Sequence, residues 1–365
     1  MPGAQERILR RRIKSVQATM KITRAMELIA ASRIMKAQAR LKASAPYESA
    51  LESALAGVLH EAGRDGARFT EVSGDGPTGL CVMVADRGLC GGYNMSVLRA
   101  ATGQLKRLAG PGEESAEGGS PSAASAVPGG SGGRYRLVTV GKKAVAYFRF
   151  RGYEITEQFT GFSDKPGFED ASRIAAALVE PYMAGELSKV VIVSTRYRSA
   201  GSQAVEARQV LPLSVPPELA ALLGMVLVEG GGSAEHNPAE SGPTEAGGSM
   251  GASAETAPAS GAPGGRGSAL LRAGSGYLET EPEPADLLSL LVPRYVEAAV
   301  FAALLEAAAS ELSFRQRAMA AATDNAEEIV KTLTRAVNRV RQDAITTEIM
   351  EIVGGAEALR EAEEE

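Results

Sequence analysis

At 365 residues, the chain is long enough for one large or two modest domains with a buried core. It is 44% hydrophobic and 23% charged, while aromatic residues make up only 5% and Trp is missing, which favours helix-on-helix packing in a soluble protein. The net charge of −5 points to no class of partner. No apolar run reaches the roughly 18 residues of a membrane span, and the N-terminus lacks the apolar core of a signal peptide, so neither is expected.

The cysteines and histidines are too few and too scattered for a zinc site. Cys81 and Cys90 are nine positions apart, and His60 and His236 are the only histidines. We expect two reduced thiols in a reducing compartment, and no metal or cofactor.

Residues 4–57 form the first predicted element, a coiled-coil helix about 75 Å long at 1.5 Å per residue. Pro46 is expected to kink it. Apolar residues recur in steps of three and four, in three groups whose register drifts, so a strict heptad is not expected. The groups are Leu9, Ile13, Val16 and Met20, then Ile22, Met26 and Ile29, then Ile34, Ala37 and Leu41.

The segment 77–213 has the pattern of an α/β domain. Strands are predicted at 79–85, 136–140 and 189–195, with helices at 93–108, 142–150 and 168–183 between them. Residues 205–213 are predicted to add an antiparallel edge strand. Alternation of strands and helices indicates a sheet covered by helices.

Two low-complexity stretches interrupt this plan. Residues 110–133 hold one Val among Gly, Ser, Ala, Pro and Glu, and Met250 is the one large apolar residue of 229–269. Neither stretch buries enough apolar surface to offset the entropy of ordering, so we expect a flexible loop at 110–133 and a low-complexity insertion at 214–276.

The segment 285–359 is predicted to be a second coiled-coil helix. Its seam follows steps of four and three, the spacing of a left-handed coiled coil, through Ala326, Val330, Leu333, Val337, Val340 and Ala344. Because an apolar stripe is not stable in water, we expect the two terminal helices to pair antiparallel. The α/β domain would then sit at one end of this rod.

Several long motifs of this chain are similar to those of the γ subunit family of F-type ATP synthases. They are IKSVQATMKITRAMELIAAS at 13–32, RIMKAQ at 33–38, DRGLCGGYN at 86–94, AMAAATDNA at 318–326 and RQDAITTEIMEIVGGA at 341–356. The resemblance covers the chain except its two low-complexity stretches. It implies a fold of paired N- and C-terminal helices with a central Rossmann-like α/β domain.

The resemblance also implies a function, that of a rotor in the central stalk of the proton-translocating enzyme. In that family the paired helices pass through a hexamer of α and β subunits, and the globular domain rests on the c-ring beside the ε subunit. The chain would have no catalytic residue of its own. It would be peripheral to the membrane, on the cytoplasmic face of a bacterial plasma membrane.

Contacts with partners follow from the same resemblance. Residues 1–48 contain eleven Lys or Arg against three Glu, a net charge of +8, which suits acidic loops of a surrounding partner. The family's β subunits present such a segment near the residue matched by Met26. Arg341 and Gln342, with Thr346 and Glu348 further along, match a catch that binds a β-subunit loop; an Arg fork makes such a contact directional. Tyr277 and Glu279 resemble the foot that contacts the c-ring or ε.

Two alternatives stay open. The Gly-rich turn at Gly88, Gly91 and Gly92 follows a strand, as a nucleotide cradle does, so a nucleotide-binding α/β protein with helical arms is the first alternative. Its spacing is not G-x-G-x-x-G, and no G-x-x-x-x-G-K-[ST] motif occurs. The second alternative is a basic coiled-coil protein that binds nucleic acid, which leaves the apolar stripe without an intramolecular partner.

Overall fold

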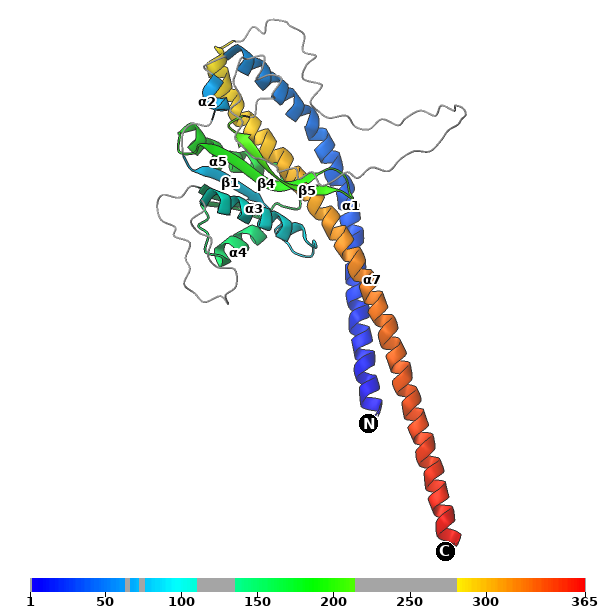
Figure 1. Cartoon of the computed structure of the whole chain (residues 1–365). Coiled ribbons are helices and arrows are strands. Elements are labelled where there is room, and N and C mark those ends of the chain that lie inside the picture. The colour runs from blue at the N-terminus through cyan, green and yellow to red at the C-terminus, as the bar shows by residue number, and fades with distance from the viewer. Residues whose placement is uncertain (1, 63–65, 72–75, 110–134, 214–280, 365) are drawn as a thin grey trace, which may run out of the picture.

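The computed structural model describes residues 2–62, 66–71, 76–109, 135–213 and 281–364. It consists of a long antiparallel helix pair and an α/β domain packed on one half of it (Figure 1). The helices are α1 (Pro2–Ala62) and α7 (Pro284–Glu364). The predicted fold class, a Rossmann-like domain with paired terminal helices, is confirmed.

The α/β domain contains a five-stranded sheet in the order β3-β2-β1-β4-β5. Its elements are β1 (Thr78–Met83), α3 (Tyr93–Ala109), β2 (Tyr135–Val140), α4 (Lys142–Phe150), β3 (Glu157–Phe159), α5 (Phe168–Met183), β4 (Lys189–Tyr197) and β5 (Gln203–Leu211). β1 to β4 are parallel, and β5 is an antiparallel edge strand, as predicted. The three-residue strand β3 and the short helix α2 (Ala67–Thr70) were not predicted from the sequence.

Two apolar cores cover the two faces of the sheet. One face packs on α3 and α4 through Val97, Leu98, Leu105 and Phe148. The other face packs on α5, on the end of α1 and on the first part of α7, in a core that includes Leu59, Leu178 and Val292. The domain therefore shares its larger core with the helix pair. It lies against the side of the pair, at the end where α1 finishes and α7 begins (Figure 1), in agreement with the predicted placement at one end of the rod.

The seam of α1 differs from the predicted stripe. Ile22 and Ile29 are 58% and 53% exposed, whereas Thr23 and Ala30 are buried. The least exposed positions follow unbroken steps of four and three: Leu9, Ile13, Val16, Met20, Thr23, Glu27, Ala30, Ile34, Ala37 and Leu41. The expected drift of register is therefore wrong. It arose because Thr23 and Glu27, which are polar, occupy seam positions.

On α7, the predicted seam from Ala326 to Ala344 is confirmed. Ala326 and Val337 are buried, and the other seam residues are half-buried. Beyond Ala344 the described side chains up to Ala356 are all exposed. Since α7 continues past the N-terminus of α1, its last part is a single helix (Figure 1).

By length and composition alone, the helical stretch Pro284–Ala356 is long and apolar enough to cross a membrane, contrary to the expectation from the sequence. In the most apolar 18-residue segment of this stretch, 50% is buried inside the protein. Leu288, Val292, Val296 and Val300 pack in the core between the helix pair and the sheet. Packing within the protein therefore accounts for this apolar stretch.

Candidate functional site

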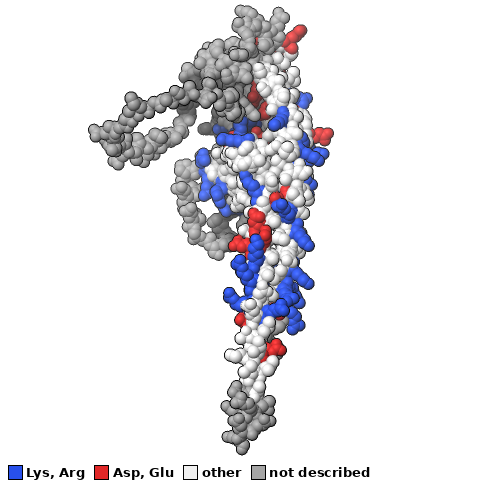
Figure 2. All heavy atoms as spheres, turned by 90° about the vertical axis from the view of Figure 1, so that its right-hand side faces the viewer, with Lys and Arg blue, Asp and Glu red and all other residues white. Residues whose placement is uncertain are grey.

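The shaft formed by α1 and α7 presents a basic surface. Lys and Arg gather along the two-helix part of the shaft, with few Asp and Glu among them (Figure 2). On α1 these cations, apart from the half-buried Arg40, are exposed and stand beside exposed apolar residues, which include Ile22, Met26 and Ile29. Met26 is 37% exposed. The surface thus combines positive charge with apolar contact area, which suits an acidic partner segment.

The residues of the predicted catch lie on the single-helix end of α7. Arg341, Gln342, Thr346 and Glu348 are all exposed. The Thr346 hydroxyl donates to the Gln342 carbonyl oxygen one turn earlier, at 3.0 Å. The Arg341 and Gln342 side chains are therefore accessible to another chain. Tyr277 and Glu279, the predicted foot, lie outside the described residues.

The carboxyl ends of the parallel strands, where sheets of this type bind ligands, carry an internal anion instead. The Asp86 carboxylate accepts the backbone N–H groups of Lys142, Gly161 and Ser163 at 2.9 to 3.2 Å. Lys142 is the first residue of α4, so Asp86 occupies the position that a phosphate takes at a helix N-terminus. Partial burial raises the pKa of Asp86, but these hydrogen bonds outweigh it and hold the pKa below its usual value.

The ends of β1 and β2 approach each other closely, next to the turn that carries Asp86. Gly141 has φ +96°, and a Cβ atom there would lie 2.2 Å from the carbonyl oxygen of Val84. Asn94 at the start of α3 accepts the N–H of Ala85 at 3.0 Å and donates to Cys90 Sγ. In the Gly-rich turn Gly91 has φ +54°, a conformation that glycine adopts readily, whereas a Cβ atom on Gly88 or Gly92 would meet no close contact, so the turn's conformation accounts for glycine at Gly91. Because Asp86 occupies the anion position, the geometry disfavours the nucleotide-binding alternative.

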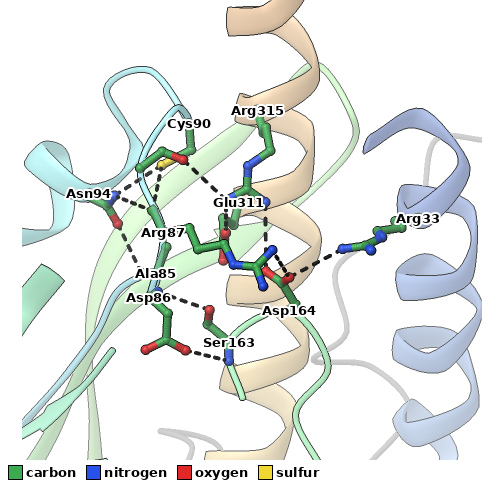
Figure 3. Close-up of polar contacts among 11 residues, drawn as sticks. Arg33, Ala85, Asp86, Arg87, Cys90, Asn94, Ser163, Asp164, Glu311 and Arg315 are labelled. Carbon is green, nitrogen blue, oxygen red and sulfur yellow. Dashed lines mark hydrogen bonds and ion pairs between the residues drawn. The ribbon is translucent and has the colours of Figure 1, made fainter. Parts of the chain in front are cut away.

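A cluster of charged side chains joins this edge of the sheet to both long helices (Figure 3). Glu311 on α7 is 2% exposed and pairs with Arg315 one turn later. Arg315, in turn, lies 3.9 Å from Asp164 in the loop before α5. Burial raises the pKa of Glu311 to about 7, against the opposing effect of Arg315. This cluster was not predicted from the sequence, although Glu311 and Arg315, two opposite charges four residues apart in an apolar stretch, are a signal for it.

The two cysteines are free thiols in the structure. Cys81 is buried in the sheet, and burial raises its pKa to about 12. Cys90 is also buried, and burial, reinforced by the charge of Glu311, raises its pKa. Both are therefore poor nucleophiles. Among the described residues, no group of three or more His, Cys, Asp or Glu is placed to hold a metal ion.

The fold and its exposed basic shaft define a class of protein, a helical stalk that carries an α/β domain and presents contact surfaces for other chains. A family model described as "ATP synthase" matches residues 5–359. Relatives named ATP synthase gamma chain share 38% identity in Frankia casuarinae and 39% in Parafrankia sp., each alignment covering 98% of both chains. The chain belongs to the ATP synthase gamma chain family.

Solved structures support the same fold. The chain resembles a rotor chain of the Euglena gracilis mitochondrial ATP synthase with a TM-score of 0.51 at 15% identity, covering 94% of this chain and 99% of that one. A second Euglena gracilis structure, of the OSCP/F1/c-ring assembly, contains a chain that matches with a TM-score of 0.55 and 15% identity, covering 98% and 95%. At this identity the likeness concerns the fold.

Proposed function

We propose that this chain is the central-stalk rotor of a proton-translocating ATP synthase and contributes no catalytic residue. It passes through a hexamer of α and β subunits, and its globular domain stands on the c-ring beside the ε subunit. Membership of the gamma chain family supports this assignment, since its relatives carry that name. The chain is then peripheral to the membrane, on the cytoplasmic face of a bacterial plasma membrane.

One observation carries this proposal, the exposed end of α7. Past Ala344 the helix has no partner helix among the described residues, yet its side chains include Ile349, Met350 and Ile352, which are 55 to 70% exposed. Apolar side chains on a lone helix are stabilised when another protein surrounds them. A ring of α and β subunits would surround this part of the helix.

The proposed contacts with β subunits have distinct physical roles. The cations of α1 attract acidic segments, and Met26 adds apolar contact beside them. Arg341 and Gln342, with Thr346 and Glu348 nearby, form a catch of hydrogen bonds that breaks and re-forms as the shaft turns. We keep Tyr277 and Glu279 as the proposed foot on the c-ring or ε.

Reconstitution tests the proposal. Purified chain mixed with its α and β partners is expected to co-elute as one complex with ATPase activity. Separate elution at micromolar concentrations would refute the assignment. The nucleotide-binding alternative predicts that the isolated chain binds ATP, and calorimetry with ATP and Mg²⁺ should show no heat of binding, because Asp86 fills the anion position.

A further inference from the structure

The globular part of the protein ends at a neck, which we define as the level of Arg33 on α1 and Arg315 on α7. Above the neck, the sheet, α5 and both helices share one apolar core. At the neck, Phe314 packs on Tyr93 with ring centroids 5.8 Å apart. Just beyond it, the Arg317 guanidinium of α7 still donates hydrogen bonds to the turn between β4 and β5, at the carbonyl oxygens of Ala200 and Gly201 and at the Gln203 side-chain oxygen. Nearer the free ends, the two helices run without the domain beside them (Figure 1). The neck is therefore close to the boundary between the part of the shaft that carries the domain and the part that runs free.

Asp164 lies at this neck and contacts three elements at once. Its Oδ2 atom is 3.3 Å from the guanidinium of Arg33 on α1 and 3.3 Å from that of Arg87 in the turn after β1. Its Oδ1 atom is 3.9 Å from Arg315 on α7, an ion pair beyond hydrogen-bond distance. Figure 3 shows the carboxylate between the two long helices, with an arginine reaching it from each.

The loop that carries Asp164 is itself fixed to the sheet. Asp86, just after β1, accepts the N–H groups of Gly161 and Ser163, and its own N–H donates to the Ser163 hydroxyl. At the far end of the loop, the Arg40 guanidinium of α1 donates to the Pro166 carbonyl oxygen. One side of the loop is thus bonded to the sheet and the other side to the helix pair.

We propose that Asp164 is a positioning residue that fixes the angle between the globular domain and the shaft, so that torque passes from one to the other. Apolar packing is non-directional and resists sliding weakly. A hydrogen-bonded ion pair has a preferred geometry, and the Arg33 guanidinium donates one such bond to Asp164 Oδ2 at 3.3 Å. Arg33 donates a hydrogen bond to this carboxylate from α1, and Arg315 pairs with it at longer range from α7, so the carboxylate is linked to both helices. The fixed angle stands without partners; the torque role rests on the proposed rotor function.

Spin labels measure the fixed angle in the isolated full chain. The labels go on Ile22→Cys of α1 and Phe150→Cys of α4, which are exposed, while Cys81 and Cys90 are buried and react slowly. Asp164→Asn is expected to broaden the distance distribution between the labels relative to the parent chain. Glu186→Gln, which removes a pair with Arg136 inside the domain, is the control and should leave the distribution unchanged.

A second, milder variant tests the proposal in case Asp164→Asn impairs folding. Arg33→Gln removes the α1 contact from a side chain that is 51% exposed, so no charge is left buried without a partner. It is expected to broaden the distribution as well. Unchanged distributions in Arg33→Gln and in folded Asp164→Asn would overturn the proposal.

Membrane vesicles that contain the whole enzyme test the torque role. Asp164→Asn is expected to lower the ratio of ATP-driven proton pumping to ATP hydrolysis, while Glu186→Gln keeps the parent ratio. A broadened distance distribution with an unchanged ratio would refute torque transfer through Asp164. Failure of the proposed rotor function gives a different result, because the parent chain itself would then fail to assemble or pump.

Discussion

The hydroxyl groups of Thr23 on α1 and Thr323 on α7 lie 2.8 Å apart, although 300 positions separate them in the chain. Each hydroxyl is also near a carbonyl oxygen of its own helix, that of Met20 or Met319. A polar pair inside an apolar seam is satisfied only in one alignment, so it selects the register of the antiparallel helices.

A double-mutant cycle on this pair tests its role in register. The double variant Thr23→Val with Thr323→Val is expected to lose less free energy of unfolding than the sum of the losses of the two single variants. The expected coupling energy is about 1 kcal/mol, because each single change leaves one hydroxyl without its partner on the other helix. Urea unfolding measures the cycle. Thr19→Val, whose hydroxyl bonds only the Ser15 carbonyl of its own helix, is the control. Strict additivity would contradict the coupling.

Gly141 offers a test of the packed strand ends. Gly141→Ala is expected to cost at least about 2 kcal/mol of unfolding free energy, because the residue has a positive φ and its Cβ would overlap the Val84 carbonyl. Gly103→Ala, in α3 with nothing within 4 Å of the added Cβ, should instead stabilise by up to about 1 kcal/mol. Thermal unfolding measures both. Equal effects would mean that the strand ends are looser than the structure indicates.

Glu311 predicts an unusual pH dependence. Its pKa is raised from 4.5 to about 7, so the folded state keeps a proton that the unfolded state releases. This group therefore lowers the free energy of unfolding as the pH rises through that window, by up to about 3 kcal/mol. Glu311→Gln should remove this decline, measured by urea unfolding at intervals across the window. Glu327→Gln, on an exposed residue of α7, should keep it. If the free energy of unfolding of Glu311→Gln fell with pH as steeply as that of the parent chain, the raised pKa would not belong to Glu311.

The basic face of α1 predicts that assembly depends on salt. Lys14→Gln with Lys21→Gln, both on exposed residues, should slow association with α and β subunits and flatten its dependence on ionic strength. Stopped-flow fluorescence measures the rate. Lys142→Gln with Lys143→Gln, on the α/β domain, is the matched control. If both pairs slow association equally, only the net charge matters.

Substitutions in the proposed catch on α7 are expected to affect the coupling of ATP hydrolysis to proton pumping and not the stability of the fold. Arg341→Ala with Gln342→Ala should change the free energy of unfolding by less than about 0.5 kcal/mol, since both side chains are exposed. Proton pumping per ATP hydrolysed by the complex should fall. Arg339→Ala, also exposed on α7, is the control. Loss of stability and coupling to the same extent would make the pair structural.

How far the sequence predicts this molecule depends on the range of the interactions. Apolar spacing locates α1, α7 and the longer elements of the sheet, since these are local patterns. It misplaces Ile22 and Ile29, because the seam passes through the polar residue Thr23, whose hydroxyl meets that of Thr323 on α7. The strand β3 has three residues, which is too short to show an alternation of apolar and polar residues. Asp164 meets Arg33 across 131 positions, and no local rule detects such a pair.

Rotation of the chain within its partners tests the central claim most directly. A complex is fixed to glass through its β subunits, and a probe is attached at Phe150→Cys, which is 83% exposed on the α/β domain. With ATP, the account predicts rotation of the probe in one direction, in steps that follow ATP hydrolysis. Steady ATP hydrolysis while the probe on an intact chain stays still would contradict it.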